Sequence, residues 1–363
     1  MENDRSSHGF VAVAREVIKI KTMNRSLLPQ GIYIYIPDGP YDPTYLHYAA
    51  HCLGVGLVEL GVPVYSNMAA PYFVTQAIES RTDSVIVFHT SERVIMNSEN
   101  YVESIEKFAA KQKVLLTLSD TSNVTFFGNK TPVLAAHGSK NMRPADRRRC
   151  WAFGLAPERI AKLANPLPFY EREPVVLRNF RPSANQAVRN VTDLALLPHL
   201  EAHFKIDRKF QGTSITDDHF ARLRRYRFCL AVGGNLVEDL LPNQAIASDP
   251  QTIANLSLFR FVRPIAVIRW DSWRFWESLA AGCVTIQLDF EKHGFELPVM
   301  PEAWKHYVPL DLSDPAATAR RMIEEPDTMA AISEQGRKWA LEHYSPKPAA
   351  QRFVDWVLQG MPT

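Results

Sequence analysis

The chain has 363 residues, enough for two domains of about 150 residues each. It is 46% hydrophobic and 22% charged, a composition that excludes a largely disordered or fibrous chain. Its 41 Lys and Arg residues against 39 Asp and Glu leave a net charge of +2, which excludes a global field that would hold a nucleic acid. We therefore expect no nucleic-acid partner.

From residue 31 onward, short β-rich runs alternate with helix-period segments, a pattern typical of a parallel sheet covered by helices. Five strands with intervening helices predict a Rossmann-like domain, which we place at residues 1–168. No clean strand is expected between residues 138 and 168. The predicted strands cover residues 31–37, 62–65, 83–89, 113–120 and 131–137, and the predicted helices cover 43–60, 72–79 and 99–111.

A second alternating series begins at residue 174 and predicts another Rossmann-like domain over residues 169–345, followed by a C-terminal helix within 346–363 that packs back towards the first domain. Two such domains predict a ligand in the cleft between them, because sites in open α/β sheets lie beyond the carboxyl ends of the strands. The predicted strands cover 174–180, 226–232, 283–289 and 307–310, and the predicted helices cover 185–197, 217–225, 272–281, 316–324, 329–343 and 349–358.

The sequence carries no sign of secretion or membrane insertion. The apolar stretch at residues 10–14 ends at Arg15, well short of a signal-peptide core, and no run approaches 18 apolar residues. No cysteine pair has the C-x-x-C spacing of a metal site or redox motif. We expect a cytoplasmic protein and leave open a peripheral association with a membrane.

The most informative segment is WDSWRFWESLAAGCVTIQLD at residues 270–289. It predicts a helix capped at residue 271 or 272, ended by Gly282 and followed by a buried strand. Arg274 and Glu277 lie one helical turn apart near its start. An arginine at a helix N-terminus suits a phosphate, and a carboxylate one turn later can accept two sugar hydroxyls. The alternative is an ordinary Arg–Glu pair on the surface.

This segment resembles the nucleotide-sugar-binding motif of exostosin-like glycosyltransferases, which reads Ser, any residue, Arg, two residues, Glu-Ala-Leu, then Ala-Gly-Cys-Ile-Pro-Val-Ile and an Asp. Residues 226–230 are also similar to the strand that precedes the motif in that family, and residues 177–181 to the Phe-Arg-Gly start of its C-terminal domain, so the resemblance covers about residues 174–345. It implies a GT-B fold, two Rossmann-like domains facing each other across a cleft, with additional helices at the C-terminus. The matching residues are Ser272, Arg274, Glu277, Leu279, Ala281, Gly282, Cys283, Val284 and Asp289.

The resemblance further implies a nucleotide-sugar donor on the C-terminal domain, an acceptor near the N-terminal domain, and inverting transfer without a metal or separate cofactor. We expect a UDP- or GDP-linked donor and a glycan, lipid-linked or small-molecule acceptor; the oligomeric state is left open. The expected donor-binding residues are Arg274, Glu277, Ser272, Gly233, Gly234, Asn235, Gly282 and Asp289.

One departure concerns the diphosphate. The Pro-Arg-Gly that the family has after its Phe-Cys-Leu strand is replaced here by VGGN at residues 232–235. Gly233 and Gly234 would let the backbone approach a donor closely, although a plain turn is the equal alternative. The arginines between this turn and Arg274 are the replacements that the sequence offers, namely Arg260, Arg263 and Arg269.

An inverting transfer also needs a base at the acceptor hydroxyl. Residues at the carboxyl ends of the N-terminal strands are the candidates, and we rank Asp38, His89 and His137 highest, with only one expected to serve. Each is alternatively a cap or turn residue.

Two other functions remain open at this stage. The first is a nucleotide-sugar epimerase on the same fold, which would need acid and base groups from both domains around one sugar. The second is a non-catalytic nucleotide-sugar or glycan-binding protein, which the missing Pro-Arg-Gly would allow.

Overall fold

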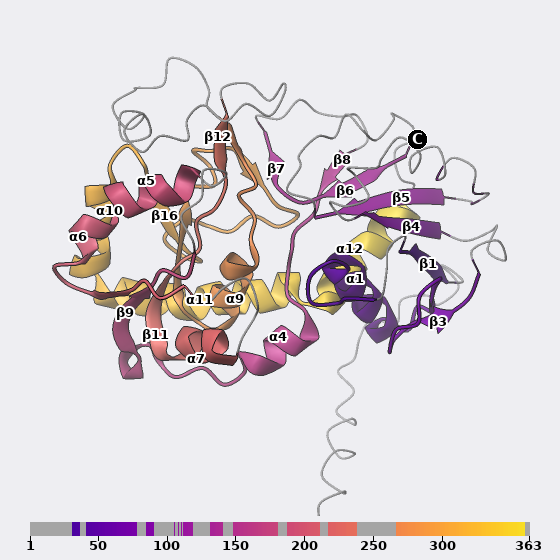
Figure 1. The fold of residues 1–363 in the computed structure, drawn as a ribbon, viewed down its shortest axis with the longest axis horizontal. Helices are drawn as coiled ribbons and strands as arrows, with labels where there is room; N and C mark the ends of the chain where they lie inside the picture. The colour runs from indigo at the N-terminus through magenta and orange to yellow at the C-terminus, as the bar shows by residue number, and fades with distance from the viewer. Residues whose placement is uncertain are drawn as a thin grey trace, which may run out of the picture.

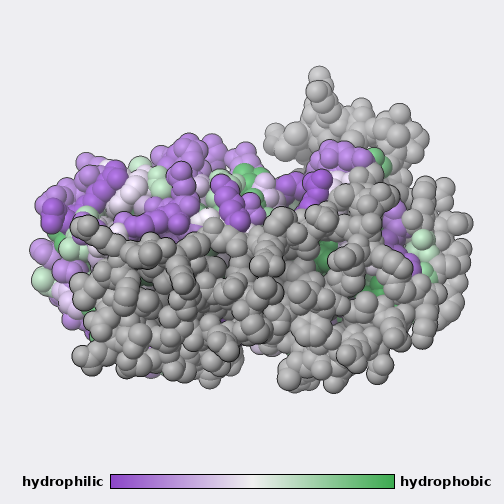
Figure 2. All heavy atoms as spheres, turned by 90° about the horizontal axis from the view of Figure 1, so that it is seen from above, coloured by the Kyte–Doolittle hydropathy of each residue, from purple (hydrophilic) through white to green (hydrophobic). Residues whose placement is uncertain are grey.

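The computed structural model describes residues 31–36, 41–77, 85–90, 105, 108, 110, 112–118, 131–140, 148–180, 187–210, 217–237 and 266–359. Within these ranges the chain forms two parallel β-sheets with helices packed on them (Figure 1). The N-terminal half, on the right in Figure 1, holds a seven-stranded sheet, and the C-terminal half, on the left, holds a five-stranded sheet. Seen from above, the coloured surface of the C-terminal half is mostly hydrophilic (Figure 2).

The N-terminal sheet has the strand order β3-β2-β1-β4-β5-β6-β8, and its strand pairs are parallel. In the central strand β1, the consecutive residues Ile32, Tyr33 and Ile34 are fully buried, so both faces of the sheet are covered here. The strands are β1 (Ile32–Tyr35), β2 (Val64–Ser66), β3 (Val74–Thr75), β4 (Val85–Thr90), β5 (Gln112–Thr117), β6 (Val133–Ala135) and β8 (Arg148–Cys150).

Two strands of this sheet contradict the sequence-based expectations. The helix predicted over 72–79 is wrong, because the β-branched Val74 and Thr75 form β3 and pair with β2 at the sheet edge. β8 lies within the stretch where no strand was expected. Its residues are mostly basic and therefore give no strand pattern in the sequence, and β8 is a strand because it pairs with β6 in the folded chain.

The first helix, α1 (Tyr48–Glu59), starts later than the predicted residue 43. The side chain of Asp42 accepts hydrogen bonds from the backbone N–H groups of Thr44 and Tyr45, so the residues before the helix form a turn. The helix predicted over 99–111 lies mostly outside the described residues.

The C-terminal sheet has the order β10-β9-β11-β14-β16, again with parallel pairs. The edge strand β10 is an addition to the predicted set, and β12 (Asn235–Val237) pairs antiparallel with β13 (Ala266–Ile268) outside the sheet. The sheet strands are β9 (Glu173–Leu177), β10 (Lys205–Asp207), β11 (Tyr226–Leu230), β14 (Val284–Leu288) and β16 (Val308–Leu310); the helices are α5 (Ala187–Ala195), α6 (Leu197–Leu200), α7 (Asp217–Arg225), α9 (Trp273–Ala280), α10 (Pro315–Glu324) and α11 (Pro326–Tyr344), with the 3₁₀ turn η5 (Phe169–Glu171) before β9.

A short antiparallel ribbon joins the two halves. β7 (Gly138–Ser139), which follows the N-terminal strand β6, pairs with β15 (Phe295–Glu296), which follows β14. The backbone N–H of Lys140 extends this pairing by donating to the carbonyl of Gly294 at 2.7 Å. The connecting segment between the halves contains one further helix, α4 (Pro157–Lys162).

The last helix, α12 (Pro346–Leu358), leaves the C-terminal half and packs beside α1 (Figure 1). Its residues Phe353 and Val354 belong to the same buried cluster as Ile32 and Ile34 of β1. The helices approach closely at Gly56, where a Cβ atom would lie 2.1 Å from the carbonyl oxygen of Pro346. Within the described residues, no helix is both long and apolar enough to cross a membrane.

Candidate functional site

The predicted donor site centres on the carboxyl end of β11, which is followed by the turn at residues 231–234. On one side, the hydroxyl of Ser272 donates to the carbonyl of Ala231 at 3.3 Å. On the other side, the backbone N–H of Val188 in α5 donates to the carbonyl of Gly234 at 3.2 Å. The starts of α5 and α9 therefore flank this turn, at the edge of the sheet where open α/β folds bind their ligands.

Arg274 occupies the first turn of α9, directly beside this edge. Its side chain is half-buried, and its Cζ lies 5.9 Å from the ring centroid of Phe180, which follows β9. Ser272 occupies the N-cap position without capping the helix by its side chain, and the first turn of α9 contains no acidic residue. The positive end of the helix dipole at this turn suits an anion, and the nearby carboxyl group of Asp271 is buried and takes its hydrogen bonds from Phe153 and Trp276.

Glu277 lies one turn further along α9, and the structure places it in the interior. The residue is only 2% exposed. Its Oε1 accepts a hydrogen bond from Arg159 Nη1 at 2.5 Å, and its Oε2 contacts His219 Nε2 at 3.0 Å. The Glu277 carboxylate therefore does not form a surface ion pair with Arg274. It is also not accessible to a sugar hydroxyl in this structure.

Glu277 is held as a carboxylate by this environment. Burial on its own would raise the pKa of Glu277, but the charge of Arg159 and the hydrogen bond from His219 outweigh burial and lower that pKa below its ordinary value. With its proton on Nε2, His219 donates to Glu277 and accepts at Nδ1 from the amide of Asn179 at 2.9 Å. This buried network links α4, α7, α9 and the end of β9.

Arg159 is a residue that the sequence analysis missed. It is 5% exposed and lies over the rings of Tyr48 and Trp273, with its Cζ 4.4 and 4.9 Å from their centroids. It also donates to the carbonyl of Thr44 at 3.2 Å, so one guanidinium contacts both halves. No motif surrounds Arg159 in the sequence, and its partner Glu277 is 118 residues away.

A second contact between the halves surrounds Asp271, just before α9. Asp271 Oδ2 accepts from the backbone N–H of Phe153 at 3.0 Å, and Oδ1 accepts from Trp276 Nε1 at 2.7 Å. Burial raises the pKa of Asp271, although the neighbouring His137 and these donors oppose the shift. Trp270 Nε1 donates to the carbonyl of Gly138 at 3.0 Å. The start of α9, which carries Arg274, is therefore fixed against the N-terminal half.

The candidate bases are found in different surroundings. Asp38 lies outside the described residues. His89, near the end of β4, is 2% exposed, and its Nε2 lies 2.8 Å from the carbonyl of Leu46. His137 is 1% exposed, and its Nδ1 accepts from the backbone N–H of Asp271 at 3.0 Å, so it belongs to the contact between the halves.

The other predicted donor residues are not all brought together. Gly282 ends α9 with a φ of +68°, at the end of the helix opposite Arg274. Asp289 follows β14, and its Oδ1 accepts the backbone N–H groups of Glu291 and Lys292 as a turn residue does. Asn235 begins β12, and its side chain is outside the description.

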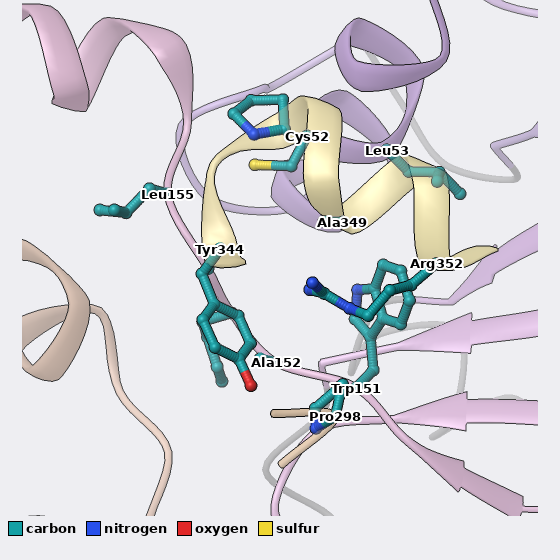
Figure 3. Close-up of a pocket in the computed structure, with 12 residues that line it drawn as sticks. Cys52, Leu53, Trp151, Ala152, Leu155, Pro298, Tyr344, Ala349 and Arg352 are labelled. Carbon is teal, nitrogen blue, oxygen red and sulfur yellow. The ribbon is translucent and has the colours of Figure 1, made fainter. Parts of the chain in front are cut away.

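A small pocket lies elsewhere in the described structure, where α12 leaves α11 (Figure 3). It is lined by residues 151–155 together with Cys52, Tyr344 and Arg352. Its volume of about 20 Å³ leaves room for a single water molecule and is far too small for a nucleotide. Among the described residues, no three His, Cys, Asp or Glu side chains are grouped so that they could hold a metal ion.

Comparison with solved structures identifies the fold. AviGT4, described as a glycosyltransferase involved in avilamycin A biosynthesis, is 12% identical, with 91% of this chain and 98% of AviGT4 covered at a TM-score of 0.51. A glycosyltransferase from Rickettsia africae ESF-5 is 10% identical, with 92% and 100% covered and a TM-score of 0.49. HepE from Anabaena, in complex with UDP and glucose, is 12% identical, with 90% and 99% covered and a TM-score of 0.46.

The likeness to AviGT4 shows a two-domain Rossmann-like fold of the GT-B type, which confirms the predicted fold class. No protein-family model matches the chain, and no curated protein matches it.

Proposed function

We propose that this protein is a glycosyltransferase that moves a sugar from a nucleotide-sugar donor to a glycan, lipid-linked or small-molecule acceptor. The position of Arg274 carries the proposal: it lies in the uncapped first turn of α9, beside the turn that follows β11. The GT-B fold and the resemblance of residues 270–289 to the exostosin-like motif support it. A UDP- or GDP-linked sugar is the proposed donor.

The chemistry of such a transfer divides between the two halves. As the acceptor hydroxyl attacks the anomeric carbon from the opposite face, negative charge develops on the leaving diphosphate. Arg274 and the N-terminal end of α9 would stabilise that charge, which is the task a metal ion performs in other transferases. We therefore propose an inverting, metal-independent reaction.

The N-terminal half would supply the base. Because His137 Nδ1 already accepts a backbone hydrogen bond at the contact between the halves, we retain Asp38 and His89 as the candidates. Glu277 is proposed to support the donor helix from the interior, since Arg159 and His219 take up its carboxylate.

Nucleotide binding is the first test. UDP, GDP, ADP and CMP are each titrated against the protein while the melting temperature is followed; one of them is expected to stabilise the fold increasingly with concentration. Arg274→Ala should abolish this shift. Arg320→Ala, which removes an exposed arginine of α10, is the matched control and should leave it unchanged. Equal shifts in wild type and Arg274→Ala would overturn the site.

The second test distinguishes the activities. The sugar conjugate of the stabilising nucleotide is incubated with candidate acceptors, and free nucleoside diphosphate is measured together with the sugar product. A transferase releases the diphosphate in step with product, whereas an epimerase converts the donor sugar without release. Tight binding with neither reaction across glycan, lipid-linked and small-molecule acceptors would favour a binding protein and contradict the proposal.

A further inference from the structure

Three guanidinium groups surround the ring of Phe180, which is fully buried after β9. The Cζ atoms of Arg178, Arg189 and Arg274 lie 4.1, 5.5 and 5.9 Å from its centroid. These arginines come from the end of β9, the start of α5 and the start of α9. Three positively charged side chains, each from a different element, therefore lie close together around the ring of Phe180.

Arg178 has an internal role in this group. Its side chain is only 7% exposed and forms a two-point ion pair with Asp193, with Nε donating to Oδ1 at 2.9 Å and Nη2 to Oδ2. Its Nη1 donates to the carbonyl of Phe180. Arg178 thus ties the end of β9 to α5, and its charge is balanced within the C-terminal half.

Arg189 and Arg274 are placed differently, because both are half-buried at the edge of the sheet. Arg189 follows Val188, whose backbone N–H donates to the carbonyl of Gly234. Arg274 lies two residues after Ser272, whose hydroxyl donates to the carbonyl of Ala231. The two arginines are consequently anchored at opposite ends of the same turn, residues 231–234.

This turn is suited to an anion held between the two arginines. Gly233 and Gly234 are buried here and carry no side chain, so no Cβ atom would separate the backbone of the turn from a bound phosphate. A guanidinium offers phosphate a planar, two-point hydrogen-bonding edge. Two such groups on either side of a turn that contains two glycines match the two phosphoryl groups of a diphosphate.

We propose that Arg189 is the second arginine of the diphosphate subsite and acts together with Arg274. This inference rests on the proposed function, and it fills the place of the missing Pro-Arg-Gly. Of the three replacements that the sequence offered, Arg260 and Arg263 lie outside the described residues, and Arg269 is half-buried just after β13 with a φ of +59°. Arg189 was not among them, because it precedes the turn by more than 40 residues and comes close to it only through the fold.

Calorimetric titration of Arg189→Ala tests the proposal, with three probes: the nucleoside diphosphate that stabilises the wild type, its parent nucleoside, and inorganic pyrophosphate. Affinity for the diphosphate and for pyrophosphate should fall at least tenfold, while affinity for the nucleoside stays within twofold. Arg189→Lys should lose less than Arg189→Ala, because it keeps the charge without the planar edge. Arg320→Ala is again the control.

The double variant Arg189→Ala/Arg274→Ala gives an independent readout. If both arginines hold one diphosphate, the loss in the double variant should be smaller than the product of the single losses. Far-UV circular dichroism and urea unfolding verify that each variant is folded, and Arg189→Gln replaces Arg189→Ala if the latter is not. Diphosphate and pyrophosphate binding within twofold of wild type in the folded Arg189 variant overturns the inference.

The outcomes separate the two proposals. Arg189-dependent binding of pyrophosphate without sugar transfer to any acceptor would leave the subsite standing and contradict the transferase. If the protein transfers sugar but its affinity for diphosphate does not depend on Arg189, the transferase proposal is supported and the Arg189 subsite is contradicted. If the wild-type protein binds neither the nucleoside diphosphates nor pyrophosphate, the proposed subsite is overturned. The transferase proposal is then tested by the transfer assay alone.

Discussion

Arg159 and Glu277 form a buried ion pair across the two halves of the molecule: Arg159 Nη1 donates to Glu277 Oε1 at 2.5 Å, and the two side chains are 6% and 3% exposed. Such a pair loses hydration on both sides, so it is tolerated only when its geometry and remaining hydrogen bonds are complete. Here Thr44 and His219 supply those further bonds. The segment after the N-terminal sheet is thereby fixed to the helix that carries Arg274.

Glu277→Gln should lower the free energy of unfolding by about 3 kcal/mol, because it leaves the Arg159 guanidinium buried without its counter-charge. Urea unfolding at pH 7 measures the change. Glu334→Gln, the same substitution at an exposed position of α11, is the control and should stay within about 0.5 kcal/mol of wild type. A wild-type unfolding midpoint for Glu277→Gln would argue against a stabilising pair.

Arg159→Met should also destabilise the fold, yet combining it with Glu277→Gln should cost less than the sum of the single changes. The reason is that the double variant buries no uncompensated charge. A double-mutant cycle by urea unfolding gives the coupling, which we expect at about 1–3 kcal/mol. Strict additivity would mean that the two side chains contribute independently.

Gly282→Ala should destabilise the protein more than Gly61→Ala. Both glycines have positive φ values, +68° and +80°, so each alanine incurs a backbone strain of about 1 kcal/mol. A Cβ at Gly282 would also lie 2.9 Å from Arg172 Nη2, which donates to the carbonyl of Ala281, whereas a Cβ at Gly61 has nothing within 4 Å. The difference in unfolding free energy therefore isolates the contact with Arg172. Equal losses would show that strain alone matters.

His293 should make stability depend on pH below neutrality. Burial, with a smaller contribution from Lys292, lowers the pKa of His293 from 6.5 to about 4, against the opposing pull of Asp289 and Asp311. The unfolded chain then takes up the proton more readily than the folded one. The contribution is complete above pH 6.5 and is lost as the pH falls through 4, amounting to roughly 3 kcal/mol.

His293→Gln is the comparison for this prediction. Carboxyl groups titrate in the same range, so the difference between wild type and His293→Gln, followed by urea unfolding from pH 7 to 4, reports the histidine alone. The wild type should lose more stability than the variant over this interval. Parallel curves would mean that His293 takes up its proton equally well in the folded protein.

The central strands and the apolar edge strand β16 could be predicted from the sequence, whereas the other edge strands could not. β1 and β4 are runs of mainly apolar and β-branched residues, and β11 is apolar except for Arg227, so their burial within the sheet can be expected from the sequence itself. β3, β8 and β10 are two or three residues long and partly polar. They are strands only because a neighbouring strand offers its unpaired backbone groups.

The site shows the same division. Ser272 and Arg274 belong to one continuous segment, so the helix pattern together with its resemblance to the exostosin-like motif was enough to propose them. Arg159, His219 and Arg189 come from α4, α7 and α5, and they reach α9 or the turn after β11 through tertiary packing. Glu277 was proposed from the same motif as Arg274. The spacing of residues on a helix does not indicate which side chains from other elements will cover Glu277.

The docking of α12 on α1 bears on how the chain folds during synthesis. The helix that completes the core around β1 is encoded at residues 346–358, so this core stays incomplete until a segment far along the chain from β1 has been translated. Until then the surface around Gly56 stays uncovered. A gene fragment that ends after the first sheet would therefore yield a product with an open hydrophobic face, and separate expression of the halves requires α12 to be supplied with the first.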